Sequence, residues 1–169
     1  MDTNKETFSS KPSQIAKAAI DVSKIIFGDL TNKKMIILGD SNLAFSIGKN
    51  LKHNQINVFE KKLKDIYYYI EKETKIIKDL ESFLNRMCIY DIFLIGFKSE
   101  YKIFNSKVAK SILEKRKFKP IFLIDCGVPG NIEQDISKIN NCFLYDLNDL
   151  EQFFSLDKGT LNSNDNANY

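Results

Sequence analysis

The stretch that decides the fold is Met35-Ile36-Ile37-Leu38-Gly39-Asp40-Ser41-Asn42-Leu43-Ala44. Its four leading apolar residues, closed by a glycine, predict a short buried strand that ends in a tight turn. After the turn, Leu43, Ala44, Ile47 and Leu51 recur at the spacing of one helical face. The stretch therefore predicts a strand, a tight turn and a helix.

The same alternation continues along the rest of the chain. One amphipathic helix is predicted before this stretch, ending near Gly28, and further helices are predicted at 63–70, 80–87 and around 108–113. Strands are predicted at 56–59, 76–77, 92–95, 121–124 and 142–145. Alternating strands and helices are typical of the α/β class, with a doubly wound parallel sheet in a Rossmann-like, three-layer α/β/α domain. We expect one domain over residues 12–154, a flexible N-terminus at 1–11 and a disordered tail at 155–169.

Composition narrows the class of protein. A chain of 169 residues, 43% of them hydrophobic, can bury a core without disulfides or metals. The net charge of +3 is spread along the chain, so we expect no direct contact with nucleic acid. Three widely spaced cysteines predict neither a disulfide framework nor a metal site, and the absence of a long apolar stretch predicts no membrane contact. These features favour a cytoplasmic protein.

The turn after the first strand is the candidate ligand site, because doubly wound sheets bind ligands at the carboxyl ends of their strands. The dinucleotide motif G-x-G-x-x-G is only partly kept: Gly39 supplies the first glycine, Ser41 replaces the second and Ala44 replaces the third. Ser41 adds atoms where a pyrophosphate approaches the backbone, and the carboxylate of Asp40 repels a diphosphate by about 1 kcal/mol or more. The helix N-terminus still offers N–H groups to an anion. The candidate nucleotide-binding residues of the turn are therefore Gly39, Asp40, Ser41, Asn42 and Leu43.

The end of the second predicted strand bears on the choice of cofactor. Glu60 stands about 20 residues after the glycine, where an acid usually binds the ribose hydroxyls of NAD. Lys61 and Lys62 follow, and they could instead neutralise the 2′-phosphate of NADP, so both cofactors stay open. Alternatively, Glu60 is a surface acid and the two lysines begin a solvated helix.

Several single residues are expected to have structural roles and not catalytic ones. Cys126 is expected to be a small packed residue, and Asp91 a turn or cap residue. His53 is expected to cap carbonyls at the end of a helix, while Phe153 and Phe154 are expected to be exposed. No catalytic residue and no metal ligand is predicted.

Several segments resemble the NADPH-binding domain of glutamyl-tRNA reductase. Residues 13–20, 26–30 and 33–39 are similar to the entry into that domain. Leu144-Tyr145-Asp146-Leu147-Asn148-Asp149-Leu150-Glu151 resembles its closing tyrosine-aspartate segment. That family has a signature after its fifth strand, and a similar segment here is Pro120-Ile121-Phe122-Leu123-Ile124-Asp125-Cys126-Gly127-Val128-Pro129. The resemblance covers residues 13–153.

The resemblance implies a role in an oxidoreductase of tetrapyrrole (porphyrin) biosynthesis. That family reduces the glutamyl ester of tRNA to glutamate-1-semialdehyde with NADPH, using a catalytic domain with a nucleophilic cysteine, a nucleotide domain and a dimerisation domain. Only the nucleotide domain is matched, so we expect that the chain alone is not a complete reductase. The resemblance adds Gly96, Phe97 and Gly127 to the candidate cofactor-binding residues.

The chain departs from the family at three places near the predicted cofactor. Glu60-Lys61-Lys62 stands where the family usually has Asn-Arg-Thr, Gly96-Phe97 stands where a threonine is expected, and Gly130 replaces the arginine after Pro129. Each change removes a contact to the nucleotide or to a neighbouring domain. These departures indicate a divergent copy.

Three hypotheses follow. In the first, the chain is an NAD(P)-binding module that works with a separate catalytic chain or as a homo-oligomer. In the second, it is a degenerate Rossmann scaffold that has lost its cofactor and acts as a protein-interaction or regulatory module. In the third, it is a stand-alone dehydrogenase of the sirohaem or shikimate type, which would need a Lys-Asp pair at the mouth of the sheet; no such pair is evident in the sequence.

Overall fold

A computed structural model describes residues 11–39, 41–52, 57–62, 85–97, 102–127 and 129–156, with only the backbone described at 52 and 57–62. Asp40, His53 and the predicted elements at 63–70 and 76–77 lie outside the described residues, as does most of the predicted helix at 80–87.

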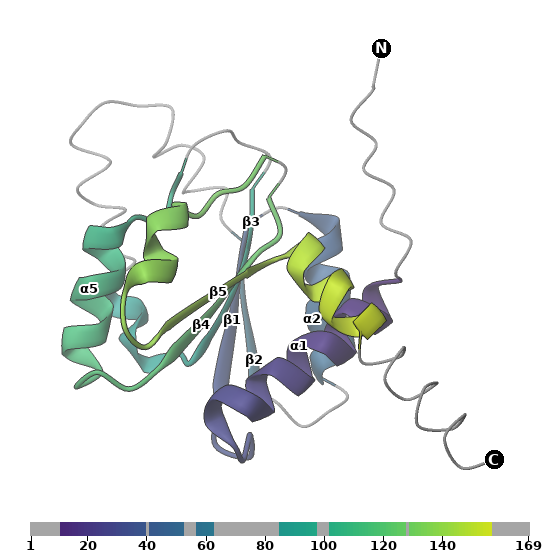
Figure 1. Ribbon diagram of the computed structural model, residues 1–169, viewed down its shortest axis with the longest axis horizontal. Coiled ribbons are helices and arrows are strands. Elements are labelled where there is room, and N and C mark those ends of the chain that lie inside the picture. The colour runs from purple at the N-terminus through teal and green to yellow at the C-terminus, as the bar shows by residue number, and fades with distance from the viewer. Residues whose placement is uncertain are drawn as a thin grey trace.

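Five parallel strands form one sheet in the order β2-β1-β3-β4-β5 (Figure 1). The strands are β1 (Lys34–Gly39), β2 (Asn57–Lys62), β3 (Ile92–Gly96), β4 (Ile121–Asp125) and β5 (Cys142–Asp146). The chain runs outward from β1 to β2 and then returns to the other side of β1 to form β3. The order of the strands therefore reverses between β1 and β3, which is where doubly wound sheets bind their ligands.

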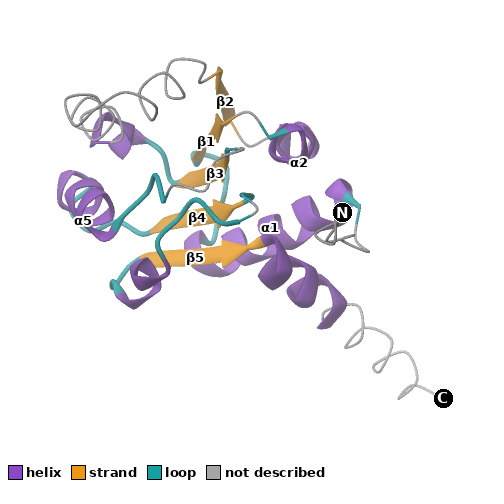
Figure 2. Ribbon diagram, turned by 90° about the horizontal axis from the view of Figure 1, so that it is seen from above, coloured by secondary structure: helices purple, strands orange, loops and turns teal. Residues whose placement is uncertain are grey.

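Helices cover both faces of the sheet, as Figure 2 shows. On one face, α1 (Pro12–Phe27), α2 (Asn42–Lys52) and a helix at residues 147–156 enclose an apolar cluster that includes Ile37 and Leu94. On the other face, α5 (Ser106–Lys115) and the 3-10 helices η1 (Arg86–Ile89) and η2 (Gln134–Lys138) enclose a second cluster. The predicted three-layer, Rossmann-like α/β fold is confirmed.

The central strands are apolar up to their last residue because both of their faces are covered. Every residue of β3 and of β4 is buried, which explains the continuous runs of Ile, Phe and Leu that predicted them. In contrast, α1 alternates buried and exposed positions at helical spacing and ends at Gly28, whose φ is +74°.

A buried ion pair between Arg116 and Asp91 lies at the amino edge of the sheet. Arg116, 8% exposed, donates to the carbonyls of Cys88, Tyr90 and Pro120, and its Nη2 lies 2.7 Å from Asp91 Oδ1. The other oxygen of Asp91 accepts the N–H of Lys34 at the start of β1, at 2.9 Å. Asp91 is thus a structural turn residue, as predicted.

Two expectations were wrong: the end of the second strand and the exposure of Phe153 and Phe154. The second strand was predicted to end at Phe59, where its apolar run stops. Pairing with β1 carries β2 on to Lys62. Phe153 and Phe154 were expected to be exposed, yet they are half-buried against the cluster under α1. The helix that carries them extends to residue 156.

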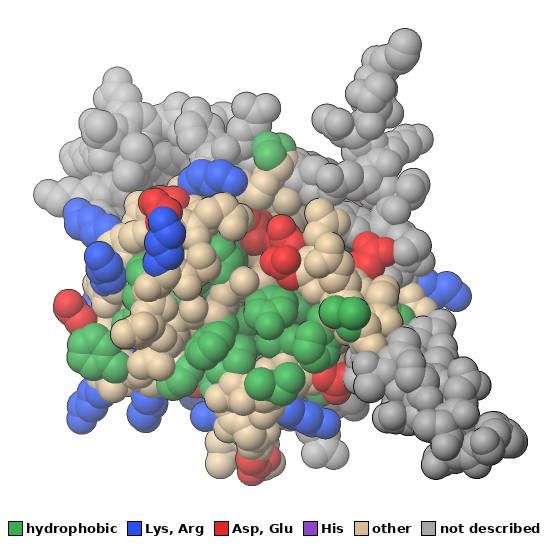
Figure 3. Space-filling view, in the orientation of Figure 1, with side chains coloured by type: hydrophobic (Ala, Val, Ile, Leu, Met, Phe, Trp, Pro, Cys, Tyr) green, Lys and Arg blue, Asp and Glu red, His purple; other side chains and the backbone are tan. Residues whose placement is uncertain are grey.

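Apolar side chains remain exposed on the face that carries β5. Figure 3 shows hydrophobic side chains gathered at the centre of this face. Phe143 of β5 is 39% exposed and Leu156 of the last helix is 72% exposed. In the sheet, β3 and β4 lie between β5 and β1, the strand that ends at Gly39.

Candidate nucleotide-binding site

The turn after β1 is packed backbone to backbone against the end of β3. Gly39 has a φ of +133°, and a Cβ atom added there would lie 1.8 Å from the carbonyl oxygen of Gly96. Gly96 is confined in turn, since its own added Cβ would lie 2.7 Å from Cβ of Ser41 and 3.1 Å from Cβ of Cys126. Both positions therefore require glycine. They bring the ends of β1, β3 and β4 into contact at the carboxyl edge.

Ser41 is the N-cap of α2. Its N–H donates to the carbonyl of Gly96 at 3.1 Å, and its Oγ accepts the N–H of Ala44 at 3.2 Å. The hydroxyl thus occupies one of the N–H groups that a helix N-terminus can offer to an anion. The N–H groups of Asn42 and Leu43 come earlier in the helix, so they are the ones that the turn can present to a phosphate.

The loop after β4 is organised by a buried carboxylate. Asp125 is 1% exposed, and its Oδ1 accepts the N–H groups of Gly127 and Asn131 while its Oδ2 accepts that of Ile132, each at 3.0 Å. Three charge-assisted bonds hold this loop in one conformation. The predicted site residue Gly127 is therefore fixed at the carboxyl edge.

Asn131 joins this loop to the end of β3. Its side chain is fully buried, and its Oδ1 accepts the N–H of Phe97 at 2.9 Å. A Cβ added at Gly127 would lie 2.1 Å from the same Oδ1, so Gly127 makes room for the amide. The side chain of Phe97 is 2% exposed and belongs to the apolar cluster under α5. Phe97 therefore offers neither its side chain nor its N–H to a ligand, because the residue is buried and the N–H is bonded to Asn131.

At Gly130, where the resemblance predicts an arginine, the structure leaves no room for a side chain. A Cβ added there would lie 2.6 Å from Oδ2 of Asp125 and 3.3 Å from Nζ of Lys102. Lys102 donates to the carbonyl of Gly130 at 2.7 Å. The loop therefore leaves no room for a side chain at this position. Any larger residue would displace the carboxylate of Asp125, which orders the loop.

The residues that organise the loop, Asp125 and Asn131, were absent from the predicted site. The available signal was an aspartate that ends a buried strand and is followed two residues later by a glycine. A buried carboxylate needs hydrogen-bond donors, and the N–H groups of a tight loop can supply them. The spacing of the sequence did not reveal which N–H groups bond to Asp125, namely those of the loop that directly follows it.

Cys126 is a packed residue, as predicted. It is 4% exposed, its N–H donates to the carbonyl of Ile95, and its Cβ adjoins Gly96. Burial raises the pKa of the Cys126 thiol far above its usual value, and the charge of Asp125 adds to the effect. The thiol therefore stays protonated and is a poor nucleophile at neutral pH.

The register of β2 changes the expected position of Glu60. In the sheet, Glu60 is paired with Ile37, Lys61 with Leu38 and Lys62 with Gly39. Lys62 is thus the residue level with the glycine turn, while Glu60 lies two residues inside the sheet. Glu60 was predicted to lie at the end of the second strand, and that prediction was wrong.

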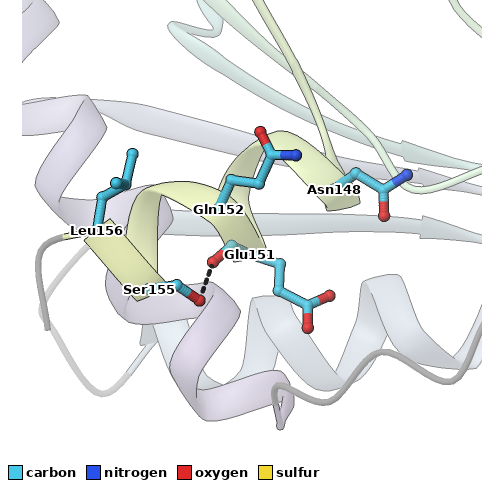
Figure 4. Close-up of a pocket in the computed structure, with 5 residues that line it drawn as sticks. All are labelled: Asn148, Glu151, Gln152, Ser155 and Leu156. Carbon is cyan, nitrogen blue, oxygen red and sulfur yellow. Dashed lines mark hydrogen bonds between the residues drawn. The ribbon is translucent and has the colours of Figure 1, made fainter. Parts of the chain in front are cut away.

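A separate concave surface of about 580 Å³ lies along the last helix. Figure 4 shows Asn148, Glu151, Gln152, Ser155 and Leu156 projecting from that helix, with Ser155 Oγ donating to the carbonyl of Glu151 at 3.0 Å. None of these five residues belongs to a strand end or to the glycine turn. Among the described residues, no group of three His, Cys, Asp or Glu side chains could hold a metal ion, and no described helix is long and apolar enough to cross a membrane.

The chain is similar in sequence to glutamyl-tRNA reductases. Glutamyl-tRNA reductase of Bacillus pumilus is 29% identical over 143 residues, covering 81% of this chain and 31% of that protein. Glutamyl-tRNA reductase of Colwellia psychrerythraea is 29% identical over 140 residues, covering 81% of this chain and 33% of that protein. The chain thus spans about a third of these relatives, and the resemblance to the nucleotide-binding part of glutamyl-tRNA reductase is confirmed.

Solved structures share the fold at lower identity. Glutamyl-tRNA reductase from Methanopyrus kandleri superposes with a TM-score of 0.67 and 15% identity, covering 92% of this chain and 41% of that one. Dipicolinate synthase from Bacillus halodurans superposes with a TM-score of 0.52 and 12% identity, covering 79% of this chain and 45% of that one. The family profile described as shikimate / quinate 5-dehydrogenase matches residues 21–153, which include the whole described sheet. The chain therefore belongs to the shikimate / quinate 5-dehydrogenase family.

Proposed function

We propose that this chain is a nicotinamide-dinucleotide-binding module that holds the cofactor at the carboxyl edge of its sheet. The observation that carries the proposal is the meeting of Gly39, Gly96 and the Asp125 loop at the point where strand order reverses. There the strand ends meet with little side-chain bulk: Gly39 and Gly96 are buried, while Asn42 is exposed and Gly127 half-buried. The N-terminus of α2 supports a phosphate.

We propose NADPH as the preferred cofactor. Lys62 is level with Gly39 in the sheet, and Lys61 precedes it. Positive charge at this edge favours a 2′-phosphate, whereas an acid there would favour the ribose hydroxyls of NAD. The position of Glu60, two residues inside the sheet, supports the same choice.

The reaction itself requires residues from elsewhere. Lys102 and Asp125 both lie against Gly130 at this edge. However, both oxygens of Asp125 already accept backbone N–H groups, so the carboxylate is engaged in holding the loop. We therefore propose a separate catalytic chain that supplies the acyl group to be reduced, as in a glutamyl-tRNA reductase divided between two proteins.

A second candidate function is a scaffold that has lost its cofactor. It is favoured by Ser41, whose Oγ occupies the N–H of Ala44 at the very place where a pyrophosphate would bind. In that case the geometry of the edge would serve stability alone.

Calorimetric titration of the full chain with NADPH, NADP, NADH and NAD separates the two candidates. Saturable binding with a preference for NADPH and NADP is expected, and Lys62→Ala should reduce that preference while leaving NADH binding unchanged. Lys110→Ala, at an exposed position on α5, is the matched control. No heat with any of the four nucleotides would overturn the proposal in favour of the scaffold.

A further inference from the structure

Strand β5 forms one edge of the described sheet and is paired with β4 alone. The carbonyl of Asn141 accepts the N–H of Ile121 at 2.9 Å, so the backbone polar groups of Asn141 point toward β4. Because these groups alternate in direction along a strand, those of Phe143 and Tyr145 also face β4. Those of Cys142, Leu144 and Asp146 face outward.

Two of the three outward N–H groups are already satisfied. Cys142 donates to the carbonyl of Ile139 at 3.1 Å, and Asp146 donates to Oδ2 of Asp149 at 2.9 Å. In the described part of the chain, Leu144 has no hydrogen-bond partner for its outward N–H and C=O. The outward N–H groups are therefore satisfied at both ends of the strand, whereas both outward polar groups of Leu144 are open.

Apolar surface surrounds this open centre. A groove of about 320 Å³ beside the strand is lined by Leu144, Tyr145, Phe153 and Leu156, together with the polar Asp149 and Gln152. Figure 3 shows the hydrophobic patch on this face. Free sheet edges usually carry Lys, Pro or a bulge against unwanted pairing, whereas β5 reads Cys-Phe-Leu-Tyr-Asp.

Charge differs between the two ends of the strand. Asp146 and Asp149 lie at its carboxyl end, joined by reciprocal hydrogen bonds of 2.9 and 2.8 Å. At its amino end, Asn141 Nδ2 donates to the carbonyl of Phe118, which places the exposed Lys117 and Lys119 nearby. An antiparallel neighbour of the same sequence would therefore set each acidic end beside a basic end.

We propose that two copies of this chain associate by antiparallel pairing of β5 with β5, about a two-fold axis that passes beside Leu144. Each Leu144 then donates its N–H to the carbonyl of Leu144 in the second copy, which satisfies the outward N–H and C=O of Leu144 in both copies. Phe143 lies opposite Tyr145 of the second copy, so exposed aromatic surface is covered on both sides. The pairing is isologous and closes at two copies. It is independent of cofactor binding.

Cysteine cross-linking tests both the association and its register. Directly opposite residues in a hydrogen-bonded antiparallel pair have Cα atoms about 5.5 Å apart, within the range that a disulfide spans. Leu144→Cys, in a Cys88→Ser background, should therefore form a disulfide-linked dimer under mild oxidation. Phe143→Cys is the matched control, because the two copies of residue 143 are displaced from each other by two residues along the strands, which puts their Cα atoms beyond about 7 Å. Cys126 and Cys142 are buried and should not contribute.

Sedimentation of the full, unmodified chain gives the second measurement. We expect a concentration-dependent dimer that weakens as salt is raised, since the charged ends are exposed. Phe143→Lys should shift the chain to monomer, whereas Ile89→Lys, on η1 before β3, should not. Circular dichroism verifies that each variant is folded. A chain that stays monomeric at high concentration, or equal cross-linking at 143 and 144, would overturn the proposal, and a dimer that survives Phe143→Lys would place the interface elsewhere.

Discussion

Asp125→Asn tests the role of the loop after β4 with a change of one atom. The carboxylate is 1% exposed and accepts three N–H groups. The amide oxygen of asparagine can keep two of them, but its NH₂ group then faces the N–H of Ile132. The variant loses one charge-assisted bond, worth about 1.5–3 kcal/mol, and leaves a buried donor unsatisfied, which costs about 1–3 kcal/mol. We expect a loss of about 3–5 kcal/mol in the free energy of unfolding.

The assay is urea unfolding combined with NADPH titration under conditions where the variant is folded. Asp91→Asn is the matched control, because it makes the same chemical change at the opposite edge of the sheet, where Asp91 contacts Arg116 and Lys34. Both variants should lose stability, but only Asp125→Asn should weaken NADPH binding, by about tenfold or more if the loop shift removes about 1.4 kcal/mol. An Asp125→Asn variant with unchanged stability would refute the account of the loop, and equal NADPH affinities would refute its link to the site.

Three further predictions concern the same edge. Ser41→Gly should strengthen NADPH binding several-fold, because it frees the N–H of Ala44, at a stability cost of a few tenths of a kcal/mol for the lost cap; unchanged affinity in a calorimetric titration would count against the pocket. Gly39→Ala should destabilise the chain by about 3 kcal/mol or more in urea unfolding, whereas Gly28→Ala, which has open space around it, should cost about 1–2 kcal/mol; similar losses would contradict the packing argument. The Cys126 thiol should resist alkylation at pH 8 in the folded chain, since burial raises its pKa, while the half-buried Cys88 reacts first; mass mapping of the modified peptides decides this.

The strands and the turn were predictable because their signals are local. Continuous apolar runs such as 92–95 and 121–124 have few alternatives to a fully buried strand, and Gly39 followed by helical spacing fixes the strand-turn-helix unit. Asp91 was also predicted as a structural residue, although its partner Arg116 was not. A buried ion pair joins residues that are distant in sequence, so local patterns do not reveal it.

The parts that escaped prediction depend on contacts between segments. The apolar run of β2 stops at Phe59, yet pairing with β1 carries the strand through three charged residues to Lys62. Phe153 and Phe154 were expected to be exposed because a neighbouring domain was expected there, but the helix at 147–156 packs them against the apolar cluster that α1 covers. Asn131 joins two loops that are 34 residues apart along the chain, and only the folded structure brings them together.

The measurement that tests the central claim most directly is a titration of the ¹⁵N-labelled full chain with NADPH, followed by amide NMR. The account predicts that NADPH shifts the amides of Ser41, Asn42, Leu43, Phe97 and Gly127 at the carboxyl edge, and leaves those of Lys34, Asp91 and Phe122 at the amino edge unchanged. Shifts confined to other surfaces, or no shifts at saturating NADPH, would contradict a cofactor site at this edge.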